Sequence, residues 1–161
     1  MNIIDFINDH KNNCFWFFLP VIIFNIIFTK YLPEYYLKNI NHPIVTIETI
    51  TRIMTIAFSV MMAINLDNRI GKIGLIIYIA GILIYFCSFI FVIKASAILL
   101  QNNLFILLAP YWTTVIWLIG IGLLGNKLFL KIPYHYTAYI VLSIAFAIIH
   151  SIHGYICVRK L

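Results

Sequence analysis

Residues 44 to 60 read IVTIETITRIMTIAFSV, an apolar stretch that contains two oppositely charged residues, Glu48 and Arg52. In an α-helix, residues four positions apart lie on the same face, so these two side chains can form an ion pair. A charged side chain at the centre of a bilayer costs about 2.5–3.5 kcal/mol on insertion scales. Two interpretations of the pair are therefore open: it locks the packing of helices, or it forms a site that exchanges protons or binds a charged ligand.

Two histidines near the C-terminal end add further titratable groups. His150 and His153 are three residues apart, so both imidazoles can serve one centre on one helix face. Three interpretations are open for them: structural hydrogen bonds, the lining of a pocket or a proton relay, and ligation of a metal or haem. Because no further histidine or carboxylate cluster accompanies the pair, we expect neither a metal nor a cofactor.

Sequence motifs of common catalytic sites are absent from the chain. No HExxH, GxSxG or Walker motif is present, and the GxG of IGIGLLG lies in an apolar run, where it favours helix packing. The three cysteines, Cys14, Cys87 and Cys157, show no CxxC spacing and sit in apolar surroundings. We therefore predict buried thiols rather than a disulfide framework.

The composition places these residues in a membrane protein. Of the 161 residues, 63% are hydrophobic and only 10% are charged, and the mean hydropathy is +1.01. Soluble domains carry roughly 25% charged residues, and a soluble fold of this size could not bury so much apolar surface. The net charge of +6 comes from basic residues scattered between apolar runs. This pattern excludes a nucleic-acid interface and suits anchoring at anionic lipids.

Five apolar segments are long enough to cross a bilayer, which takes about 20 residues. We predict a single all-α domain over residues 1–161, a polytopic transmembrane helix bundle with five spans. Alternating apolar and polar residues at 3–9 predict a short interfacial helix ahead of the first span, and Pro110 predicts a kink in the fourth. The positive-inside count is tied, so the orientation stays open. The predicted spans are residues 14–31, 44–66, 73–93, 104–125 and 136–158.

An odd number of crossings brings the polar residues of all five segments to one half of the membrane. The second span enters and the fifth leaves at the same face, so Glu48, Arg52 and the two histidines lie about 6–12 Å below it. Because polar side chains avoid lipid, we predict that these groups line one polar pocket open to that face. The other predicted pocket residues, about 7–14 Å deep, are Asn25, Tyr85, Tyr111 and Thr113.

The stretch LAPYWTTVIWLIGIGLLG, residues 108–125, and the ETITR segment around Glu48 resemble stretches of uncharacterised bacterial small multi-span membrane proteins. No activity is assigned to that group. The resemblance therefore implies only a setting, which is a multi-pass protein of the bacterial inner membrane.

Three functions are compatible with these residues. The favoured one is a module that binds or transports a lipid-like or amphipathic molecule or protons, with Arg52 pairing with an anionic group and Glu48 or His150 exchanging protons. The second is an accessory or assembly subunit that packs against a membrane-protein partner through glycine-rich faces. The last is a small lipid-modifying enzyme that uses Glu48 and His150 as acid and base. Membrane lipids are the expected surroundings in every case.

Overall fold

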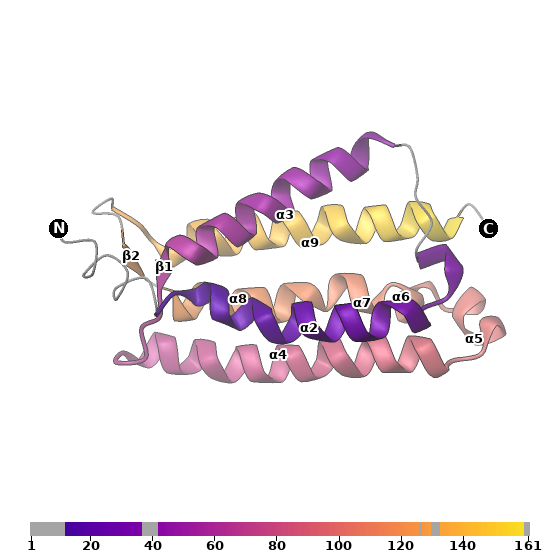
Figure 1. The fold of residues 1–161 in the computed structure, drawn as a ribbon, viewed down its shortest axis with the longest axis horizontal. Helices are drawn as coiled ribbons and strands as arrows, with labels where there is room; N and C mark the ends of the chain where they lie inside the picture. Colours follow the sequence, from indigo (N-terminus) through magenta and orange to yellow (C-terminus); the bar gives the residue numbers. More distant parts are fainter. Residues whose placement is uncertain (1–11, 37–41, 126, 130–132, 160–161) are drawn as a thin grey trace.

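The structure of the chain is a computed structural model that describes residues 12–36, 42–125, 127–129 and 133–159. Most of this part is helical, and the long helices lie side by side along one axis (Figure 1). The interfacial helix expected at residues 3–9 lies outside the described residues.

Consecutive helical segments run in alternate directions along this axis (Figure 1). The first consists of η1 (Cys14–Phe18), α2 (Leu19–Phe28) and η2 (Thr29–Tyr31), followed by the short η3 (Glu34–Tyr36). The chain returns through α3 (Pro43–Met61) and turns again into α4 (Arg69–Lys94). Beyond these come α5 (Ala97–Asn102), α6 (Leu104–Leu107), α7 (Ala109–Trp112), α8 (Thr114–Leu124) and α9 (Tyr136–Arg159).

Four helical segments of the described residues are long and apolar enough to cross a membrane. The prediction of a mostly helical chain with several membrane-length helices is therefore confirmed. The first and the last of these segments have the predicted bounds almost to the residue, and the third is several residues longer than predicted. The four segments are Cys14–Tyr31, Pro43–Met61, Arg69–Lys94 and Tyr136–Val158.

The predicted fourth span, residues 104–125, is not one continuous helix. The helix is interrupted at Leu108 and at Thr113, and Ala109–Leu124 is the shorter apolar run that remains. Pro110 lies in the first turn of α7, where its missing N–H and its ring prevent continuation from α6. The hydroxyl of Thr113 donates to the carbonyl of Ala109 at 2.7 Å, a back-bond that often bends helices.

The predicted second span, residues 44–66, ends early, at Met61. Beyond it β1 (Met62–Ala63) pairs antiparallel with β2 (Lys127–Leu128), and Asn13 forms a bridge with Ala63. We call Asn13, β1 and β2 the end clip, because they tie the start of the first helical segment to the α3–α4 and α8–α9 connections at one end of the bundle. The fold therefore contains a small two-stranded sheet that the predicted all-α bundle did not include.

α4 and α8 pack closely because glycines face the contact. A Cβ atom added to Gly81 would lie 2.6 Å from the backbone nitrogen of Trp117, and one added to Gly120 would lie 2.5 Å from the backbone nitrogen of Tyr78. Such distances leave no room for a side chain, so the helices approach through their backbones. The contact fixes Tyr85 and Trp117, which line the site described below.

We expect Gly81→Leu to lower the free energy of unfolding by about 1–3 kcal/mol, because overpacking must push α4 and α8 apart. The neighbouring Ala80 is exposed, so Ala80→Leu adds the same side chain at the surface of α4 and serves as the matched control. Thermal unfolding of both purified variants in one detergent measures the difference. Equal stability of the two variants would contradict the close packing of α4 on α8.

Candidate ligand-binding site

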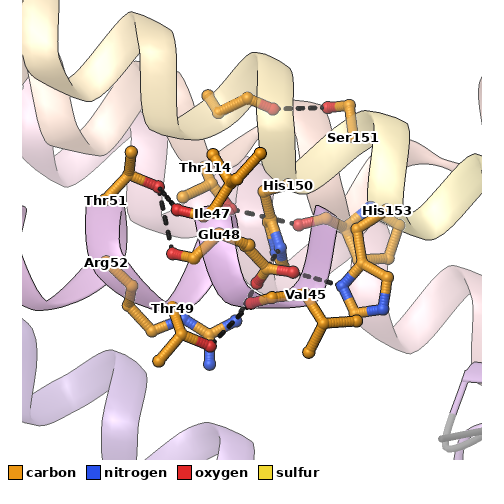
Figure 2. A network of polar contacts seen from close by, with 12 residues as sticks. Val45, Ile47, Glu48, Thr49, Thr51, Arg52, Thr114, His150, Ser151 and His153 are labelled. Atoms are coloured by element: carbon orange, nitrogen blue, oxygen red, sulfur yellow. Dashed lines mark hydrogen bonds and ion pairs between the residues drawn. The ribbon is translucent and has the colours of Figure 1, made fainter. Parts of the chain in front are cut away.

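Glu48 is the centre of a polar network between α3 and α9 (Figure 2). Its side chain is only 2% exposed. Oε1 accepts a hydrogen bond from Nη2 of Arg52 and lies 3.0 Å from Nδ1 of His150, while Oε2 contacts Nδ1 of His153. One buried carboxylate therefore meets one permanent cation and two groups that can become cations.

The helices position these side chains through simple spacing. His42 begins α3 as its N-cap, where Nδ1 accepts the backbone N–H of Ile44 at 3.1 Å, and Pro43 occupies the first turn. From that start, Glu48 and Arg52 lie one turn apart on the same face of α3. His150 and His153 are likewise neighbours on α9, which packs against α3. The pair on α3 and the pair on α9 thus come together at the Glu48 carboxylate.

Aromatic rings hold the imidazole of His150 in place. Its ring centroid lies 4.7 Å from that of Tyr111 and 5.3 Å from that of Phe146, which is nearly parallel to it. Tyr111 also stacks on Tyr36 with 5.6 Å between centroids. A Cβ atom added to Gly154 would lie 2.7 Å from the Tyr111 ring, so glycine allows this ring to lie against α9. The packing orients His150 toward Glu48.

Two adjoining cavities of about 340 Å³ each lie beside this network. We call them the apolar cavity and the polar cavity. The apolar cavity is walled mainly by hydrophobic side chains of α2, α3, α8 and α9, and the polar cavity contains Glu48, His153 and Tyr111. Both volumes suit small ligands. The residues that line both cavities are Asn25, Arg52, Tyr85 and His150.

The structure brings together nearly all of the residues that the sequence selected. Asn25 accepts a hydrogen bond from the Tyr85 hydroxyl at 2.8 Å, which connects α2 to α4 beside Arg52. Those that line one or both cavities are Asn25, Glu48, Arg52, Tyr85, Tyr111, His150 and His153. Whether they bind a ligand remains a prediction.

Thr113 is the predicted residue that lies away from the cavities. It is buried, and its hydroxyl lies 3.3 Å from that of Ser88 on α4. Thr114, one position along, lines the apolar cavity instead. Successive helical side chains differ in direction by about 100°, and an argument from membrane depth does not distinguish such neighbours.

Sequence reasoning did not select Thr29, Trp117 and Phe146 as cavity residues. Phe146 precedes His150 by four positions, and this spacing could have indicated that the two rings share a face. Thr29 and Trp117 carry no such signal, because the packing of α2 and α8 brings them to the cavities.

Among the residues that the structure describes, no group of three or more His, Cys, Asp or Glu side chains could hold a metal ion. Both imidazoles turn Nδ1 toward the Glu48 carboxylate. The arrangement therefore resembles a hydrogen-bonded acid–base network more than a set of metal ligands.

No protein-family model matches the chain, and no curated protein or solved structure is detectably similar to it. The resemblance to bacterial multi-span proteins therefore stays a prediction.

Proposed function

We propose that this protein is a multi-pass membrane protein whose two cavities bind, or pass across the membrane, a small amphipathic or lipid-like ligand. The observation that carries the proposal is the Glu48 carboxylate, surrounded by Arg52 and two imidazoles beside a cavity within apolar helices. Polar contacts between membrane helices contribute only about 0.6 kcal/mol on average, whereas each central charge costs about 2.5–3.5 kcal/mol on insertion. Helix packing alone is therefore a poor reason for these groups.

We also propose that the chain crosses the membrane five times, with α6, α7 and α8 together forming the fourth crossing. The alternating directions of the segments in Figure 1 support this. Ala109–Leu124 alone would extend about 24 Å, and α6 supplies additional length. Interrupted helices are tolerated at membrane depth where protein covers the break. Pro110 and Thr113 at this break are both buried.

We expect Arg52→Ala to abolish ligand-dependent thermal stabilisation of the purified protein in a non-ionic detergent. A panel of fatty acids, lysophospholipids and isoprenoid alcohols provides the probes. A ligand present at 100 times its Kd stabilises the wild type by about 2.7 kcal/mol, and this gain should disappear when the guanidinium is removed. Arg69→Ala changes an exposed arginine outside the cavities, so this control should keep the full gain. Stabilisation retained in Arg52→Ala would contradict the proposed role of Arg52.

A second candidate function, acid–base catalysis on a bound lipid, is favoured by the orientation of the two imidazoles. Each directs Nδ1 at Glu48, which leaves Nε2 as the position that can exchange a proton, and both rings line the polar cavity. A histidine held in this way by a carboxylate can act as a general base. A mass change in lipids incubated with the wild type, and no change with Glu48→Gln, would identify this activity.

A further inference from the structure

We infer that the ligand is an anionic amphiphile, with a negatively charged head at Arg52 and an alkyl tail in the apolar cavity, and that it enters sideways between α2 and α3. This inference rests on the proposed function and specifies its ligand class. Three features of the site support it: the accessible charge, the available hydrogen-bond donors and the position of the apolar wall.

The accessible charge of the site is positive. Glu48 is 2% exposed, and both of its oxygens already accept contacts from neighbouring side chains. The Arg52 side chain is 51% exposed and lines both cavities. It meets Glu48 through Nη2, and a guanidinium carries five N–H donors, so donors remain for a second partner. Arg52 is therefore the more accessible charge for a ligand in either cavity, and an anion matches it.

The uncharged polar groups of the walls also act as donors. The Oδ1 atom of Asn25 accepts from Tyr85, so its amide N–H groups are available to an acceptor. The indole of Trp117 is 3% exposed and lines the apolar cavity, and its N–H has no hydrogen-bond partner within the described residues. A buried donor without a partner is unfavourable, and an acceptor atom of a ligand would satisfy it.

Two wall threonines use their hydroxyl hydrogens within their own helical segments, so they offer no donor to a ligand. Thr55 donates to the carbonyl of Thr51 at 2.8 Å, and Thr114 donates to that of Pro110 at 3.2 Å. The available donors are therefore those of Arg52, Asn25 and Trp117, and a head rich in acceptor oxygens, such as a carboxylate or a phosphate, matches them.

The apolar cavity reaches the outer surface of the bundle. Two of its wall residues on α2, Ile22 and Ile26, are 36% and 74% exposed. α3 leans away from α2 toward its Pro43 end (Figure 1) and packs instead on α9 and η1. In a bilayer this opening faces hydrocarbon, so an alkyl tail can slide in without entering water. The apolar wall residues are Phe18, Val21, Ile22, Ile26, Ile56 and Phe146.

A quenching experiment tests head charge and tail position together. The chain has three tryptophans, so Trp16→Phe with Trp112→Phe leaves Trp117 as the fluorophore. The probes are three brominated C18 amphiphiles with the same tail and a carboxylate, a maltoside or a trimethylammonium head, and inorganic phosphate serves as a probe without a tail. We expect the carboxylate probe to quench Trp117 saturably, with a Kd at least tenfold lower than the Kd of the maltoside and trimethylammonium probes. Inorganic phosphate alone should bind weakly. Arg52→Ala should remove this preference, and Arg69→Ala should keep it.

The outcomes separate the inference from the function on which it rests. Equal affinity for the three heads, or a preference for the cation, overturns the anionic head while ligand binding stands. Thermal stabilisation of the wild type by the carboxylate probe without quenching of Trp117 overturns the tail position. Tight binding of inorganic phosphate overturns the need for a tail. If none of the three amphiphiles stabilises the wild type or quenches Trp117, the proposed binding function itself fails.

Discussion

Glu48→Ala is expected to lower the free energy of unfolding by about 3–5 kcal/mol, the usual effect of removing one partner from a buried ionic network. The reason is that Arg52 and both imidazoles contact this carboxylate between α3 and α9. Without it, a cation and two polar rings face an apolar interface. Unfolding of the purified protein in mixed micelles with increasing sodium dodecyl sulfate measures the loss.

Two further variants show whether burial of the Glu48 charge causes this loss. Glu34→Ala removes an exposed carboxylate in η3, and its effect should stay within about 0.5 kcal/mol. Glu48→Gln keeps the size and one acceptor oxygen but removes the charge, so its stability should lie between that of the wild type and that of Glu48→Ala. A loss for Glu48→Ala no larger than that of the Glu34 control would show that Glu48 does not hold the two helices together.

The second large effect is an all-or-none difference in labelling across the interrupted helix. In a chain without its natural cysteines, we expect Asn102→Cys and Lys127→Cys to react with a membrane-impermeant maleimide from opposite sides of the membrane. The two positions are exposed and flank α6–α8. Intact cells compared with inverted vesicles provide the measurement.

A third position calibrates this labelling. Glu34 begins η3, whose Tyr36 hydroxyl donates to the carbonyl of Leu107 in α6, so Glu34→Cys should be labelled from the same side as Asn102→Cys. Labelling of Asn102→Cys and Lys127→Cys from one common side would show that residues 104–124 do not cross, and the proposal of five crossings would be wrong. Such a result would leave the contacts around Glu48 unchanged.

The sequence predicted the membrane-length helices well where an apolar run ends at polar or charged residues. Lys94 ends α4 and Arg159 ends α9, each one residue beyond the predicted end, whereas α4 begins at Arg69, four residues before the predicted start. It failed after Met61, because Met62–Leu66 is as apolar as the helix before it. What ends the helix there is pairing with Lys127–Leu128, more than sixty positions away. A local hydropathy pattern carries no trace of such a distant partner.

The sequence predicted which residues form the site better than it predicted how they are arranged. Spacing along each helix placed Glu48 with Arg52 and His150 with His153, and equal membrane depth placed the two pairs at one level. The central position of Glu48, with Arg52 left half exposed, was not predictable. That outcome depends on how α3 is rotated about its axis against α9, and packing of the whole bundle sets this rotation.

The end clip anchors the C-terminal end of α3. Met62–Ala63 pairs with β2 and bridges to Asn13, while the opposite end of α3 leans away from the bundle (Figure 1), so we expect any tilt of α3 to pivot about the end clip. Glu48 lies about 20 Å along the helix from the end clip, so a tilt of α3 by about 5° would displace the Glu48 carboxylate by nearly 2 Å. That displacement exceeds what a hydrogen bond tolerates. A small tilt of α3 would therefore break the contacts of both imidazoles with Glu48 at once and leave the pairing of β1 with β2 intact.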